Sequence, residues 1–268
     1  MEYLKSLTSV RYATWFMDDH LVLRSSASWR YPRRVRRDME RHLRGASTVF
    51  VISPALGEFY EREFGVSSEV LFCPADPHGE PLYEPPCGTG PLTIGYFGRV
   101  WEWQLDEILR FGASLRAGEQ VLHVYSPDTA FHDRLRLPAI ELKGALAPGE
   151  VRERMRSYDA VLVPIGFGDT ERNLTEFNIA TKLSECLASG TVTIVYGPPC
   201  AAMVRLLHGT DAAHVITSRD LRDWADVAAA LQDAGDRRRR LNSARKFVRR
   251  HASSDVMRSR WRAAVEKL

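Results

Sequence analysis

Short apolar runs alternate with longer amphipathic segments along most of the chain. Nine runs bounded by turn residues predict strands, at residues 12–16, 48–52, 70–72, 92–97, 121–125, 140–142, 160–164, 192–195 and 213–216. Segments with helical spacing of apolar residues predict helices at 33–43, 54–64, 104–115, 148–157, 180–189, 201–207, 221–233, 236–251 and 254–267. This alternation predicts an α/β fold in which helices cover both faces of a parallel sheet.

The segment 73–90 interrupts this alternation with five prolines and three glycines in 18 residues. Such a density is typical of a linker or an extended connection. We therefore expect a partial N-terminal α/β domain at 1–75, a Pro/Gly-rich linker at 76–90, a complete six-strand α/β domain at 91–251 and a final helix at 252–268. Three strands are few for a first domain, so we expect its front part to be missing from this chain.

Composition points to an ordinary globular protein. Hydrophobic residues make up 44% of the 268 residues and charged residues 26%. No apolar run reaches the roughly 18 residues of a membrane span, and the first residues lack a signal-peptide core, so we expect a cytoplasmic location. The four cysteines form no Cys-x-x-Cys pair and the eight histidines no His-x-x-x-His pair, so no metal site is expected.

Positive charge is concentrated in two runs, although the net charge is only +3. Eight arginines fall between Arg24 and Arg44, and seven arginines with Lys246 fall between Arg237 and Arg250. Both runs have helical spacing, so one interpretation is two solvated helix faces. The other is a surface that attracts nucleic acid or an anionic membrane, which would place the protein peripherally at a bilayer.

The first candidate binding element follows the strand at 92–97, where Gly98 and Arg99 stand at its end. Glycine has no Cβ and tolerates positive φ, so a ligand can approach the backbone there. The guanidinium of Arg99 can then bind a phosphate through two parallel hydrogen bonds. The glycine pattern of dinucleotide-binding folds is absent, so neither NAD nor any other cofactor is expected.

A second candidate element, Gly144-Ala145-Leu146, follows the strand at 140–142 and precedes a helix. The carboxyl ends of parallel strands share one sheet edge, so this turn should lie near Gly98. Its backbone can hydrogen-bond the edge of a nucleotide base. An ordinary strand-to-helix turn explains the same pattern equally well.

The third candidate element begins the predicted helix at 180–189. Asn178 is a favourable N-cap, and Gly190 suits the left-handed position after the last turn. Free N–H groups at residues 179–181, together with the helix dipole, would attract an anion.

Three side chains extend this third element. Lys182 adds a full positive charge near the start of the predicted helix. Thr181 and Glu185 are four residues apart and share a face, where the carboxylate can accept hydrogen bonds from ribose hydroxyls. The alternative is a solvated lysine and glutamate on an amphipathic helix.

The polar segment 166–176 connects a strand with that helix, and we expect it to be a loop. Loops on a rigid scaffold commonly carry substrate contacts. Glu171, Asn173 and Glu176 are therefore candidates to contact a sugar.

Residues 92–250 resemble the nucleotide-binding half of the retaining GT-B glycosyltransferases, a large family that includes sucrose synthase-like and mannosyltransferase-like enzymes. The matching motifs are Ile94-Gly-Tyr-Phe-Gly98-Arg99, Lys143-Gly144, Met155-Arg-Ser-Tyr158-Asp-Ala-Val-Leu-Val-Pro164 and Thr181-Lys-Leu-Ser-Glu185-Cys-Leu-Ala-Ser-Gly190. Trp15-Phe-Met-Asp-Asp19 and segment 51–65 resemble the late part of the family's first domain. The resemblance implies a GT-B-like fold with a Rossmann-like second domain, and a final helix that crosses back to the first.

This resemblance also implies an activity, the transfer of a sugar from a UDP- or GDP-sugar to an unknown acceptor with retention of configuration. Arg99 and Lys182 would be the catalytic residues, because they would neutralise the leaving diphosphate in place of a metal. Glu185 would hold the ribose. Gly98, Gly144, Ala145, Leu146, Glu176, Asn178 and Thr181 would complete the donor site.

The chain departs from the family pattern at two positions. The family often has a glutamate eight residues before the one matched by Glu185, whereas this chain has Phe177 there and Glu176 one position out of register. The family also has a lysine a few residues after the matched Arg99, whereas this chain reads Trp101-Glu-Trp-Gln104.

Two functions of other classes remain open. One is a non-catalytic module that binds a nucleotide sugar or serves as a scaffold, because the first domain is expected to be partial. The other is a nucleic-acid or membrane-surface binder that uses the arginine runs. A second copy or a partner chain completing the first domain is a further expectation.

Overall fold

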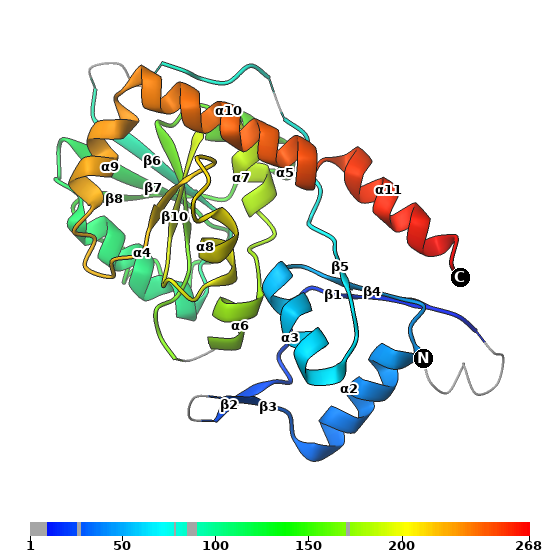
Figure 1. Ribbon diagram of the computed structural model, residues 1–268. Coiled ribbons are helices and arrows are strands. Elements are labelled where there is room, and N and C mark those ends of the chain that lie inside the picture. Colours follow the sequence, from blue (N-terminus) through cyan, green and yellow to red (C-terminus); the bar gives the residue numbers. More distant parts are fainter. Residues whose placement is uncertain (1–9, 26–27, 78, 85–89, 170–171) are drawn as a thin grey trace.

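The computed structural model describes residues 10–25, 28–77, 79–84, 90–169 and 172–268, which build two parallel sheets and a short hairpin (Figure 1). The strands are β1 Ala13–Phe16, β2 Leu23–Ser25, β3 Ser28–Arg30, β4 Thr48–Val51, β5 Glu69–Val70, β6 Leu92–Phe97, β7 Gln120–Tyr125, β8 Ile140–Gly144, β9 Ala160–Pro164, β10 Val192–Tyr196 and β11 His214–Ile216. The helices are α2 Arg33–Gly45, α3 Pro54–Phe64, α4 Glu102–Ser114, α5 Pro148–Met155, α6 Arg172–Phe177, α7 Leu183–Ala188, α8 Ala202–Leu207, α9 Trp224–Leu231, α10 Ala234–His251 and α11 Ser254–Val265.

The predicted α/β class is confirmed, and a strand or helix stands at each of the predicted positions. Three elements were not predicted. The hairpin strands β2 and β3 have only three residues each and no clear alternation of apolar residues. Helix α6 occupies the end of the segment 166–176, so the prediction of a loop was wrong there.

The larger sheet has the strand order β11-β10-β9-β6-β7-β8, with all neighbours parallel. Successive residues of β10 serve opposite faces. Ile194 joins the apolar cluster beneath α4 and α9, whereas Val195 joins the cluster beneath α7 and α8. All residues of β9 and β10 are buried, as expected for strands covered on both faces. The direction of chain progression reverses between β6 and β9, which defines a switch point in the sheet.

The smaller sheet has the order β1-β4-β5 and shares an apolar cluster with the larger one. The rings of Phe59 and Phe177 stack with their centroids 4.5 Å apart. The Ser53 hydroxyl donates a hydrogen bond to the Phe177 carbonyl. The end of α6 is thereby fixed against α3, and one continuous core joins the two sheets.

The segment between the sheets is anchored to the larger one. The Leu82 N–H donates to the carbonyl of Gly190, and the Tyr83 hydroxyl donates to Asn242 of α10. Residues 78 and 85–89 of the predicted linker lie outside the described residues. At the other end, Trp261 of α11 stacks on Phe50 of β4, which agrees with a final helix that returns to the first sheet. The domain limits themselves stay a prediction.

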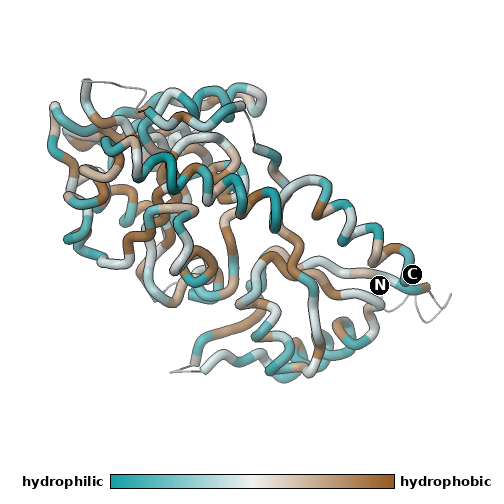
Figure 2. Tube along the Cα trace, turned by 45° about the horizontal axis from the view of Figure 1, so that its top comes forward, coloured by the Kyte–Doolittle hydropathy of each residue, from teal (hydrophilic) through white to brown (hydrophobic). Residues whose placement is uncertain are grey.

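Figure 2 shows that α10 is largely hydrophilic, as its arginine run predicts. Arg237 differs from the expectation of a solvated face, because its side chain is fully buried. Its guanidinium donates hydrogen bonds to the carbonyls of Leu82, Asp159 and Leu231. Arg237 therefore connects α10 by hydrogen bonds to Leu82 in the segment between the sheets and to Asp159 just before β9. Among the described residues, no helix is long and apolar enough to cross a membrane.

Replacing Arg237 with methionine should lower the free energy of unfolding by about 3 kcal/mol or more, because buried carbonyls lose charge-assisted hydrogen bonds. Urea denaturation measures this loss. Arg249→Ala, at an exposed position of the same helix, is the matched control and should change stability by less than about 0.5 kcal/mol. Equal stabilities for the two variants would contradict the structural role of Arg237.

Candidate functional site

A cleft of about 460 Å³ lies at the carboxyl ends of the central strands of the larger sheet. Gly98 and Arg99 enter it from the end of β6, Ile165 from the end of β9, and Ala145 with Leu146 from the end of β8. The cleft therefore lies at the switch point between β6 and β9, where open α/β sheets bind ligands.

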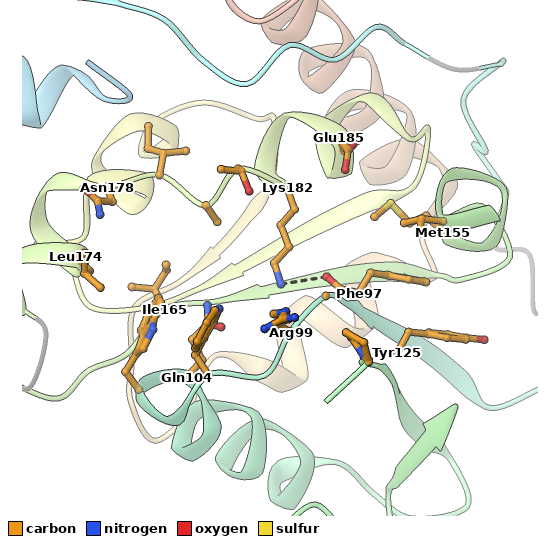
Figure 3. Close-up of a pocket in the computed structure, with 18 of the residues that line it drawn as sticks. Phe97, Arg99, Gln104, Tyr125, Met155, Ile165, Leu174, Asn178, Lys182 and Glu185 are labelled. Atoms are coloured by element: carbon orange, nitrogen blue, oxygen red, sulfur yellow. Dashed lines mark hydrogen bonds between the residues drawn. The ribbon is translucent and has the colours of Figure 1, made fainter. Parts of the chain in front are cut away.

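The centre of the cleft is cationic (Figure 3). The Lys182 ammonium donates a hydrogen bond to the Phe97 carbonyl at 3.1 Å and lies 3.8 Å from the centroid of the Tyr96 ring. Gly98 has φ +128°, and a Cβ at this position would stand 3.4 Å from the Lys182 nitrogen. The glycine thus leaves space between backbone and ammonium.

No carboxylate among the described residues neutralises the charge of Lys182. Among the described residues it forms no ion pair, and burial lowers its pKa to about 8. Arg99 supplies a second positive charge with a more exposed side chain. Its Nε is 3.9 Å from Asp128, and its guanidinium carbon is 5.9 Å from the centroid of Trp101. Both cations are available to an anionic ligand.

One end of the cleft is apolar and flat. Tyr125, Leu146, Val151 and Met155 line it, and the Tyr125 ring stacks on Phe97 with an interplanar angle of 4°. Figure 3 places Tyr125 and Met155 on the same side of Lys182. This end suits the face of a planar ring system.

The carboxylate of Glu185 borders this apolar end from α7. It is half-exposed, and its nearest cation is Arg152 at 3.9 Å. Its oxygens are therefore free to accept hydrogen bonds from a ligand. Thr181 also lines the cleft, so the predicted common face of Thr181 and Glu185 is turned toward it.

The predicted capping role of Asn178 is wrong. Helix α7 begins at Leu183, and Asn178 instead follows α6 and donates a hydrogen bond to Asp18 at 2.5 Å. The amide lines the cleft together with Asp18. Because α7 has only six residues, the attraction of the cleft for anions comes from Lys182 and Arg99 rather than from a long helix. Gly190 has φ +82°, which confirms the left-handed position.

Two other predicted donor residues lie away from the lining of the cleft. Glu176 accepts hydrogen bonds from Arg172 at 2.6 Å and from the Trp29 indole at 2.9 Å. Gly144 ends β8 with φ +74°, and its successors Ala145 and Leu146 are the residues that reach the cleft.

Asn173 and Glu171 are the other residues of segment 166–176 that were predicted to contact a sugar. The structure does not support that role for either of them. Asn173 donates to the carbonyl of Asp19 at 2.6 Å and so contributes to the contact between the two halves. Glu171 lies outside the described residues.

Sequence reasoning missed Asp18 and Gln104, which also line the cleft. The Gln104 amide donates to the Pro164 carbonyl at 3.1 Å and is buried. Gln104 belongs to the motif noted above only as a departure from the family. Asp18 belongs to the motif Trp15-Phe-Met-Asp-Asp19, which was matched to the family's first domain but to no site.

The sequence matches no protein-family model and no curated protein. Solved structures, in contrast, are similar over almost the whole chain. Anabaena HepE in complex with UDP-glucose superposes with a TM-score of 0.69 at 13% identity, over 99% of this chain and 75% of that one. A glycosyltransferase from Rickettsia africae gives a TM-score of 0.68 at 13% identity, over 99% and 73% of the two chains.

A third similar structure is that of S. aureus TarM in complex with fondaparinux, alpha-GlcNAc-glycerol and UDP. Its TM-score is 0.69 at 10% identity, and the match covers 96% of this chain. The chain spans about half the length of TarM, 51% of it, and about three quarters of HepE, 75%. At such identities the likeness shows the fold alone, the GT-B fold that these solved glycosyltransferase structures share.

Proposed function

We propose that this protein binds a nucleotide-diphosphate sugar in the cleft and transfers the sugar to an acceptor. The observation that carries the proposal is the ammonium of Lys182, held beside Gly98 at the switch point without a carboxylate partner in the part of the chain that the structure describes. A half-buried cation without a counter-ion among the described residues is costly in the ligand-free protein, and a diphosphate would offset that cost. Arg99 at the same strand end adds the second charge.

The cleft offers a place for each part of such a donor. The base would lie on the apolar end, with Tyr125 and Leu146, and its edge would face the backbone after Gly144. The ribose would be held by Glu185, and the diphosphate would lie between Arg99 and Lys182. The sugar would then extend toward the end of the cleft lined by Leu174 and Asn178.

In the transfer step, Arg99 and Lys182 would stabilise the negative charge that develops on the departing diphosphate. Preoriented charges in a partly water-excluded site are effective because they need not reorganise as the bond breaks. Retention of configuration follows from the family resemblance. UDP and GDP sugars are the favoured donors on the same basis.

Binding without turnover is the nearest alternative, since every contact named above is a donor contact. The two are separated by incubating the protein with each UDP- and GDP-sugar and measuring release of the free nucleotide. If the protein binds the nucleotide sugar but releases no free nucleotide, it is a nucleotide-sugar-binding module and not a transferase.

Lys182→Ala should weaken binding of UDP or GDP by about 10- to 100-fold, because a charged hydrogen-bond donor is worth about 1.5–3 kcal/mol. Isothermal titration calorimetry measures this loss. Lys246→Ala, at an exposed position of α10, is the matched control and should leave affinity unchanged. Equal affinities for the wild type and Lys182→Ala would refute the proposed donor site.

The same interaction predicts a pH dependence. An anionic ligand favours the protonated amine, so binding raises the pKa of Lys182 above its ligand-free value of about 8. Nucleotide affinity should consequently be level near pH 7 and fall as the pH rises above about 8. Lys182→Arg keeps its charge at these pH values and should flatten the profile. A profile of the same shape in both proteins would exclude Lys182 as the titrating group.

Glu185→Gln should weaken UDP binding by about 10-fold, since one charge-assisted hydrogen bond is lost. The loss should be smaller for 2′-deoxy-UDP if the carboxylate accepts from the 2′-hydroxyl. Calorimetry with the two nucleotides on both proteins gives the comparison. An equal loss for both nucleotides would assign Glu185 to another part of the ligand.

A second candidate function, docking on an anionic membrane surface, is favoured by one observation. Leu21, just before β2, and Leu23, the first residue of β2, are 50% and 57% exposed, and Leu23 pairs across the hairpin with Arg30. Within the described residues, Arg33, Arg34 and Arg37 of α2 are exposed and form no ion pair. Exposed apolar side chains that closely precede these arginines in the chain suit a headgroup region.

Replacing Arg33, Arg34 and Arg37 with glutamate should reduce sedimentation with phosphatidylserine vesicles at least 10-fold, since each arginine contributes about 1 kcal/mol. Wild-type binding should also fall with added salt. The control, Arg249→Glu with Arg250→Glu, alters the second run and should have a smaller effect. No binding to anionic vesicles at low salt would remove this candidate.

A further inference from the structure

A second, larger cavity of about 880 Å³ adjoins the cleft, and we call it the α4 cavity. Asp18, Trp101, Trp103 and Leu174 line both spaces, so the cavity opens beside the donor cleft. The start of α4 forms one wall, and the loops that follow β1, β9 and β11 form the others. Neither the donor contacts nor the core packing explains it.

Trp101, Glu102 and Trp103 build this wall, in the motif where the family has a lysine. Trp101 is 53% exposed, which is unusual for so large an apolar side chain in a protein surface. Trp103 is half-buried and packs on the core, so it presents only part of its indole. Two aromatic rings at a cavity mouth offer flat apolar surfaces for the C–H faces of a pyranose ring.

Carboxylates provide most of the polar lining. Asp18, Glu102, Asp106 and Glu107 line the cavity, and the basic residues of the lining are His20 and Arg219. Asp106 also pairs with Arg134 at 3.4 Å, which leaves its second oxygen for other donors. Glu107 is only 2% exposed; it accepts a hydrogen bond from the Phe167 N–H at 3.1 Å, and burial raises its pKa. Carboxylates accept hydrogen bonds from sugar hydroxyls and repel phosphates and other carboxylates.

The two spaces therefore differ in charge, with cations at the centre of the cleft and an excess of carboxylates in the α4 cavity. Their border lies at Trp101, whose ring is 5.9 Å from the guanidinium carbon of Arg99. A diphosphate is attracted to one side of this border and repelled from the other. A lysine at the border would have extended the positive field into the cavity.

We propose that the α4 cavity binds the acceptor, and that this acceptor is a carbohydrate without phosphate or carboxylate groups. The acceptor role rests on the proposed function; binding of such a carbohydrate does not. Trp101 stacks on a sugar ring, and Glu102 and Asp106 accept hydrogen bonds from its hydroxyls. An acceptor in this position meets the donor at the shared residues Asp18 and Leu174.

Saturation-transfer-difference NMR with lactose, chitobiose, glucose 6-phosphate and glucuronic acid tests carbohydrate binding without a nucleotide. Lactose or chitobiose should give signals on the ring protons, and the two anionic sugars should give none. Trp101→Ala should reduce the signals at least five-fold, whereas Trp101→Phe keeps an aromatic face and should retain most of them. Because Trp101 is exposed, loss of folding is not expected, and circular dichroism checks it.

Charge selection is tested by Glu102→Gln combined with Asp106→Asn, which should let glucose 6-phosphate bind. Asp226→Asn, at an exposed position of α9, is the matched control and should not. The proposal is overturned if glucose 6-phosphate binds the wild type as well as lactose does, if neither neutral sugar binds, or if Trp101→Ala binds lactose normally.

Calorimetry with UDP and GDP on the wild type separates this result from the donor proposal. Nucleotide binding without neutral-sugar binding leaves the donor site and removes the acceptor cavity. Neutral-sugar binding without nucleotide binding keeps a carbohydrate site but removes its acceptor role.

Discussion

The structure is organised around one cation, the ammonium of Lys182, whose described neighbours are a carbonyl and an aromatic face but no carboxylate. Burial disfavours the charged amine, and the hydrogen bond to Phe97 compensates only in part. Holding the amine there requires the strand end at Phe97, the glycine that follows it and the turn before α7. The fold thus maintains an arrangement that favours an anion at the switch point of the sheet.

The surroundings of this cation divide the site by charge. Arg99 extends the positive region at the cleft, while the start of α4 turns tryptophans and carboxylates toward the neighbouring cavity. The two regions share a border only a few side chains wide. Such a border would orient an anionic ligand and a neutral ligand more strictly than shape alone. A charged group on the wrong side of it would lose solvation without gaining a partner.

The parts of the fold that could be predicted are those in which local pattern and packing agree. Apolar runs such as 160–164 and 192–195 mark buried strands, and the order of strands brings Gly98, Lys182 and Glu185 to one sheet edge. The sequence also placed Ala145 and Leu146 in the cleft, because strand ends in a parallel sheet meet there.

Structure and expectation differ most where a distant partner decides a side chain's role. Asn178 bonds to Asp18, 160 residues away, instead of capping a helix. Arg237 is buried because carbonyls from three separate segments converge on it. Glu176 is held by Arg172 in a helix too short to show a clear pattern, and by Trp29 from the hairpin. No local sequence pattern predicts such long-range hydrogen bonds.

The shared core between the two sheets has a mechanical consequence. A cleft between two halves of a protein often closes around its ligand by a hinge motion. Here the stacked rings of Phe59 and Phe177, together with the bond from Ser53, couple α3 to the segment that carries the cleft wall. Any hinge motion that separated the halves would open apolar surface to water, at a cost of about 25 cal/mol for each Å². Ligand entry should therefore depend on side chains at the rim, such as Trp101, rather than on rigid rotation of one half.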